Sequence, residues 1–162
     1  MSRVALEVGA FTWGRVQRLY HADTIAHWRR CAAAGFECPQ EVFAQLFHED
    51  AGNPDLAAIL RVVDWGRVRW ELKELAGEAL RHVRVDRAFQ HAVDEARARP
   101  LRFGDAGTWA VPPVIVAGGV IGTNAGFELL VGHTRVGSVL GLLDRGDIPE
   151  QHRHLVWVGT AA

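Results

Sequence analysis

The chain has 162 residues, enough for one compact domain with its own hydrophobic core. Hydrophobic residues make up 49% and charged residues 23%, a globular balance that excludes a disordered polypeptide. The net charge of −1 argues against a broad basic surface for nucleic acid. The chain lacks a signal-peptide pattern, and no apolar run approaches the roughly 20 residues that span a bilayer, so we expect a cytoplasmic protein without a membrane partner.

The first hundred residues read as mainly helical. Helix caps, prolines at first helical positions and apolar residues at helical spacing predict two or three short helices between residues 23 and 64. Alternating apolar and charged residues then predict a strand over 67–72, followed by a short helix over 76–82. Asp86 caps the next helix, which Pro100 ends.

Beyond Pro100 the chain reads as short strands separated by glycine turns. Two apolar runs predict strands over 114–116 and 127–131. A glycine turn leads from the second strand into a helix that ends near Asp144, and a last strand covers 155–158. This order predicts an α+β fold with a small mixed β-sheet and several packed helices, most of them from the N-terminal two-thirds.

We predict a single domain over 1–162. Within it, residues 1–100 form the mainly helical part and residues 101–162 form the part that carries most of the sheet. The sequence contains no repeat, low-complexity tract or linker that would argue for a second domain.

The turn between the strand over 127–131 and the helix after it combines residues that suit an anion. A helix start presents unpaired backbone N–H groups and the positive end of the helix dipole. Gly132 allows close approach or a positive φ, and His133 and Thr134 add donors. Arg135 can bind a phosphate through two parallel hydrogen bonds. The same pattern also fits an ordinary strand-to-helix turn, in which Gly132 only makes the corner.

Two stretches around this turn resemble the ParB/sulfiredoxin superfamily. They are Pro112-Pro113-Val114-Ile115-Val116 and Phe127-Glu128-Leu129-Leu130-Val131-Gly132-His133-Thr134-Arg135-Val136-Gly137. Members share a strand, a variable hairpin and a second strand that ends in a Gly-x-x-Arg or Gly-His-x-Arg turn before a helix. The resemblance covers residues 109–160 and implies a mixed sheet of that type. ParB proteins bind CTP at this turn, sulfiredoxins use ATP there, and related free-serine kinases transfer phosphate.

By this resemblance, Gly132 corresponds to the motif glycine and Arg135 to the phosphate-binding arginine, while His133 and Thr134 fill the positions between them. Sulfiredoxins carry their catalytic cysteine directly after the glycine. His133 occupies that position here, which argues against sulfinic-acid reductase activity.

Two further features depart from the family pattern. Kinase-like relatives often carry an acidic residue before the glycine, where this chain has Val131, and the nearest carboxylate is that of Glu128. The basic second box and the helix-turn-helix domain of chromosome-segregation ParB proteins have no counterpart, which argues against DNA segregation.

Other residues have weaker functional patterns. Trp109, just before the first strand of the resemblance, is a candidate for stacking on a base, although tryptophan more often packs in a core. Asp105 lies in a glycine-bearing loop that either closes over a ligand or is a plain surface turn. His152 and His154 provide half of a metal site at most, and a surface strand end is favoured for them.

We therefore predict a nucleotide-phosphate-binding, ParB/sulfiredoxin-like bacterial protein that takes ATP or CTP with Mg²⁺ and acts as an NTPase or phosphotransferase. The predicted catalytic residues are His133 and Glu128, and the predicted nucleotide contacts are Gly132, His133, Thr134, Arg135 and Trp109. A small molecule or protein would be its further partner. The alternatives are a nucleic-acid-binding or ParB-like nuclease protein, disfavoured by the net charge, and a non-enzymatic interaction module of a toxin–immunity or phage-defence system.

Overall fold

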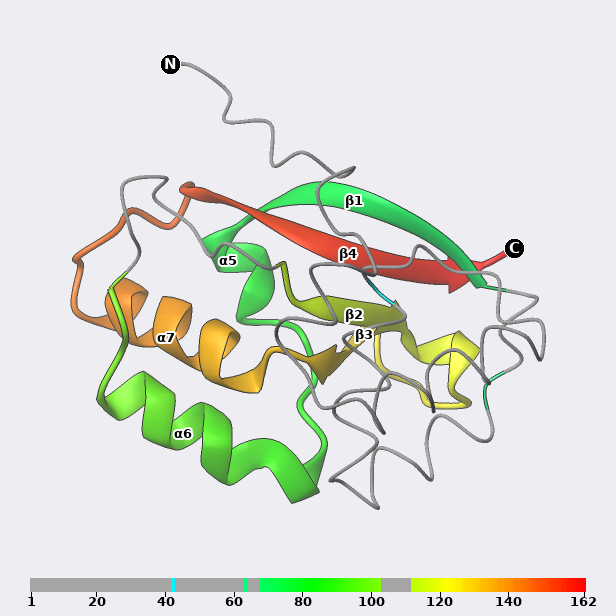
Figure 1. Ribbon diagram of the computed structural model, residues 1–162, viewed down its shortest axis with the longest axis horizontal. Coiled ribbons are helices and arrows are strands. Elements are labelled where there is room, and N and C mark those ends of the chain that lie inside the picture. The colour runs from blue at the N-terminus through cyan, green and yellow to red at the C-terminus, as the bar shows by residue number, and fades with distance from the viewer. Residues whose placement is uncertain (1–41, 43–62, 64–67, 103–111) are drawn as a thin grey trace, which may run out of the picture. The chain divides into compact units, whose positions relative to one another are not determined.

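Figure 1 shows the computed structural model, which describes residues 42, 63, 68–102 and 112–162. The chain divides into two compact units, Met1–Arg69 with Ala162 and Trp70–Ala161. The second unit contains nearly all the described residues. Apart from Val42 and Val63, the segment predicted to form the first helices lies outside them, and the single domain over 1–162 stays a prediction.

Four strands form one mixed sheet, as the sequence predicted. In chain order the elements are β1 (Val68–Ala76), α5 (Gly77–Leu80), the 3₁₀ turn η3 (Arg87–Phe89), α6 (Gln90–Ala98), β2 (Val114–Ala117), the 3₁₀ turn η4 (Gly118–Val120), β3 (Phe127–Val131), α7 (His133–Asp144) and β4 (Arg153–Ala161). The strand order is β1-β4-β2-β3 (Figure 1). β2 pairs with β3 in antiparallel fashion and with β4 in parallel fashion, so the sheet is mixed and the class is α+β.

β1 and β4 run in opposite directions. The N–H of Gly77, directly after β1, donates to the carbonyl of His152, directly before β4, over 3.0 Å. At the other end of the pair, the ring of Trp70 packs against Gly159, where a Cβ would lie 2.8 Å from the indole. Both strands are longer than the sequence predicted, with 9 residues each.

One face of the sheet forms the main hydrophobic core with α7. Ile115, Leu129, Val156 and Val158 from the strands join Val136, Val139, Leu140 and Leu143 from α7 in a single buried cluster. α6 contributes Val93 to the same cluster and lies alongside α7 (Figure 1). None of the helices in this described part is long and apolar enough to cross a membrane.

α6 and α7 approach each other closely because α7 turns two glycines towards α6. A Cβ on Gly137 would lie 2.5 Å from the carbonyl oxygen of Val93, and a Cβ on Gly141 would lie 2.3 Å from that of Arg97. The two glycines are four residues apart, so they share one face of the helix. No side chain fits at either position while the helices keep this distance.

The helix ends follow the predicted signals in part, since Asp86 caps the 3₁₀ turn η3 that leads into α6, whereas α6 itself has no side-chain cap. The side chain of Asp86 accepts a hydrogen bond from the N–H of Ala88 (2.9 Å) at the start of η3. At the end of α7, Gly146 takes a positive φ of 70°. The N–H of Gly146 donates to Leu143 and that of Asp147 donates to Leu142, which is the Schellman pattern.

A cluster of ion pairs joins the ends of α5, α6 and α7. The carboxylate of Asp144 contacts Arg97 at 2.5 Å and Arg81 at 2.9 Å, and Arg81 also binds Glu150 at 2.8 Å. Hydrogen bonds from Arg97 and then from Arg81 lower the pKa of Asp144 to about 2. These side chains are partly exposed, so we expect each pair to contribute little alone.

The close helix contact predicts that Gly141→Ala destabilises the protein. Alanine favours a helix over glycine by about 1 kcal/mol, but the new methyl group would overlap the backbone of Arg97. We expect a net loss of roughly 1–3 kcal/mol in the free energy of unfolding, measured by urea titration.

Gly119→Ala is the matched control. Gly119 is exposed, and a Cβ there meets nothing within 4 Å, so we expect a change within about 0.5 kcal/mol. Equal stability of Gly141→Ala and the parent chain would contradict the packing of α6 on α7.

Candidate functional site

The turn between β3 and α7 requires glycine for two reasons. Gly132 has φ 98° and ψ 30°, in the left-handed region that other residues rarely adopt. A Cβ on Gly132 would also lie 2.6 Å from the Cβ of Pro113. The carbonyl of Gly132 accepts the first helical hydrogen bond, from Val136 at 2.9 Å. This glycine therefore makes the corner and lets the backbone pass close to Pro113.

The first turn of α7 is a site of positive potential. The helix has 12 residues, its first turn contains no acidic residue, and no side chain caps it. Arg135 adds its own charge here, since its Nη2 lies 3.1 Å from the position that a Cβ on Gly132 would occupy. The guanidinium thus folds back towards the start of the helix. Backbone N–H groups, the helix dipole and Arg135 all favour an anion at this turn.

His133 packs inwards rather than presenting a charged donor. Its ring stacks on Phe89 with centroids 4.5 Å apart and planes inclined by 24°. Burial and then the nearby charge of Arg135 lower the pKa of His133 to about 4, against a smaller raising effect of Asp86. Within the described residues, its Nε2 is buried without a hydrogen-bond partner. His133 is therefore neutral at pH 7 and contributes packing to the turn.

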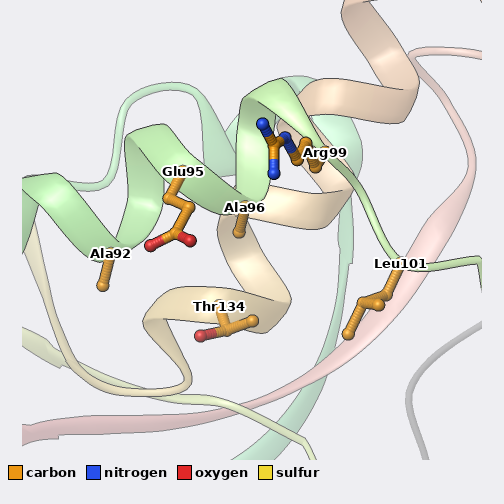
Figure 2. Close-up of a pocket in the computed structure, with 6 residues that line it drawn as sticks. All are labelled: Ala92, Glu95, Ala96, Arg99, Leu101 and Thr134. Atoms are coloured by element: carbon orange, nitrogen blue, oxygen red, sulfur yellow. The ribbon is translucent and has the colours of Figure 1, made fainter.

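Thr134 points into a hollow between α6 and α7 (Figure 2). The hollow measures about 300 Å³. Its other lining residues are Ala92, Glu95, Ala96 and Arg99 of α6, and Leu101 after it. Thr134 therefore belongs both to the turn at the start of α7 and to this hollow.

Glu128 lies away from the turn, on β3. It pairs with Val116, whereas the next residue, Leu129, pairs with Ile115 on the face that α7 covers. Neighbouring strand residues point to opposite faces, so the carboxylate of Glu128 points away from α7. Glu128 is buried, with 2% of its surface exposed, and forms an ion pair with Arg84.

The backbone of Arg84 holds that ion pair in place. Arg84 donates its N–H to the carbonyl of Phe127 (2.8 Å) and accepts a hydrogen bond from the N–H of Leu129 (2.9 Å). It therefore borders β3 on either side of Glu128. The structure brings Gly132, His133, Thr134 and Arg135 together but places Glu128 with Arg84 instead.

The predicted base-stacking residue Trp109 and the loop residue Asp105 lie outside the described residues. For metals, the described ranges hold no group of three or more histidine, cysteine or acidic side chains placed to share an ion. His152 and His154 do meet, with ring centroids 4.9 Å apart. His154 is fully buried in β4, so the expectation of a surface strand end was wrong for it.

Sequence reasoning missed four residues that lie beside predicted site residues: Arg84 at Glu128, Phe89 at His133, and Glu95 and Arg99 in the hollow beside Thr134. Phe89 belongs to the 3₁₀ turn η3, and its ring stacks on that of His133, a contact that no spacing in the sequence indicates. Glu95 and Arg99 had no recognisable motif. Their spacing with Ala92 and Ala96, at three and four residues, does place all four on one helix face.

The lowered pKa of His133 predicts a loss of stability in acid. An ordinary histidine has a pKa near 6.5 and folded His133 one of about 4, so the unfolded chain binds the proton more readily. The contribution of neutral His133 to the free energy of unfolding is fully present above pH 6.5, and it is lost as the pH falls from 6.5 towards 4. We expect His133→Asn to weaken the pH dependence of the unfolding free energy in this window, measured by urea titration at several pH values.

His82→Asn is the control, because His82 is exposed. Buried His154, whose pKa burial also lowers to about 4, adds a second contribution that both variants retain. If His133→Asn and the parent chain lose stability equally between pH 6.5 and 4, the ring of His133 is not held neutral by its surroundings.

No family model, curated protein or solved structure matches this chain.

Proposed function

We propose that the protein binds a nucleoside triphosphate, ATP or CTP, through the turn Gly132–Arg135. The observation that carries this proposal is the start of α7, where a left-handed glycine opens a helix without an acidic first turn and Arg135 folds back over it. The likeness of this stretch to the ParB/sulfiredoxin superfamily supports the same proposal.

Each component of the turn has a chemical task in holding phosphate. The first N–H groups of α7 donate to phosphate oxygens along the helix axis. The guanidinium of Arg135 binds two oxygens in parallel, and the exposed hydroxyl of Thr134 donates to a third. Gly132 keeps the entrance free of a side chain. No carboxylate in the first turn repels the ligand.

Mg²⁺ fits this proposal as an ion carried by the nucleotide. Mg²⁺ commonly keeps several waters and binds phosphate oxygens with only one or two carboxylates. Since the described residues contain no cluster of three ligands, the phosphates would supply most of its coordination. The protein's own contribution is the positive charge of Arg135 and the helix start.

Binding is better supported than catalysis. Of the two predicted catalytic residues, Glu128 is engaged by Arg84 on the strand and lies on the other face of the sheet. His133 is neutral and borders the turn, but a pKa of about 4 makes it a weak base near neutral pH. Its stacking on Phe89 favours a supporting role while the nucleotide is bound.

The proposal predicts that ATP or CTP with Mg²⁺ raises the melting temperature and that Arg135→Ala abolishes the effect. Ligand at about 100 times its Kd adds about 2.7 kcal/mol, which corresponds to roughly 5–10 °C for a chain of this size. Without the guanidinium the turn loses its only side-chain charge. Thermal unfolding against a nucleotide panel, with and without Mg²⁺, measures this.

Arg145→Ala is the matched control for charge. Arg145 lies just beyond the other end of α7, where its guanidinium donates a hydrogen bond of 2.8 Å to the carbonyl of Ala98. We expect this variant to retain the nucleotide response. If no nucleotide stabilises the parent chain, the proposal fails. The turn would then either bind a backbone phosphate of nucleic acid or have only a structural role.

A further inference from the structure

The hollow beside Thr134 is lined mainly by one face of α6, which includes two small side chains. On α6 the lining residues recur at positions 92, 95, 96 and 99, which is one face of a helix. Ala92 and Ala96 carry only a methyl group, so the space above them stays open between the helices (Figure 2). A larger residue at position 92 would fill it.

Leu101 forms the apolar end of this hollow and is held there. Its side chain is 66% exposed, the largest exposure of a big hydrophobic residue in the described ranges. Its N–H donates to the hydroxyl of Ser138 over 3.1 Å, which ties the chain after α6 to α7. Ser138 lies one turn after Thr134 on the same face of α7. Leu101 therefore gives the hollow an apolar end whose backbone is tied to α7.

Two ionic groups complete the lining. The carboxylate of Glu95 accepts hydrogen bonds, and the guanidinium of Arg99, one turn later, donates them and can stack on a planar ring. The methyl groups and Leu101 offer the apolar contact that the faces of a base prefer. The carboxylate of Glu95 can accept hydrogen bonds from the exocyclic amino groups of bases and from the hydroxyls of ribose.

We infer that this hollow holds the nucleoside, base and ribose, of the nucleotide whose phosphates bind at Gly132–Arg135. Thr134 belongs to both places, so phosphates at the helix start lie next to the opening of the hollow. The inference rests on the proposed function and adds that affinity comes from the nucleoside as well as from charge. Glu95 and Arg99 are then binding residues for the nucleoside.

The test compares ATP and CTP with inorganic tripolyphosphate, which has the same charged chain but no nucleoside. Binding of each is measured by calorimetry on the full chain. We expect both nucleotides to bind the parent at least about tenfold more tightly than tripolyphosphate. In Ala92→Met, which fills the hollow, this preference should disappear while the affinity for tripolyphosphate is unchanged.

Ala98→Met is the matched control, since Ala98 is exposed on the same helix and does not line the hollow. It should retain the preference of the parent. Glu95→Ala provides a second variant on an exposed position, should Ala92→Met not fold, and it should lower the affinity for nucleotides alone. Urea titration establishes that each variant is folded.

The outcomes separate this inference from the proposed function. If tripolyphosphate binds the parent as tightly as ATP and CTP, the turn binds phosphate but the nucleoside site is wrong. If the nucleotides are preferred and that preference survives both Ala92→Met and Glu95→Ala, the nucleoside binds elsewhere and this inference also fails. If neither tripolyphosphate nor any nucleotide binds, the proposed function fails, and the inference that rests on it fails as well.

Discussion

The contact of α6 with α7 at Gly137 and Gly141 is the constraint on which the candidate site depends. Because α7 has no side chains at these two positions, α6 lies directly against its backbone. That distance seats Phe89, at the start of α6, against the ring of His133. It also sets the width of the space that Thr134 shares with α6. If α6 and α7 lay farther apart, the turn at Gly132 would stay the same. Phe89 would then no longer stack on His133, and α6 would no longer line the space beside Thr134.

The two ends of this helix pair are held differently. At the far end, Asp144 binds Arg97 and Arg81, and α7 closes with a glycine that satisfies its last carbonyls. At the near end, the first turn of α7 has no acidic residue and no capping side chain. At the far end, two arginines thus balance the charge of Asp144, whereas Arg135 reinforces the positive charge of the near end. This asymmetry is what makes an anion at the near end physically reasonable.

The sequence predicted those parts of the fold whose signals are local. β2, β3 and α7 follow apolar runs bounded by Pro113, Gly132 and Gly146, and the structure confirms these boundaries. The direction of Glu128 could not be read locally, because the register shifts between Val114 and Ile115 and the partner, Arg84, is 44 residues away.

The other long-range features escaped prediction for the same reason. The stacking of Phe89 on His133 joins residues from separate elements, and no spacing in the chain records it. His154 appeared to sit at a polar strand end, yet β4 is a central strand and buries it.

The central position of β4 in the sheet has a consequence for folding. β4 is the last of the four strands in the chain but lies between β1 and β2. These two strands are therefore not joined in one sheet until β4 pairs with both of them. The contacts that close the sheet therefore join distant parts of the chain, a topology that is associated with slower folding.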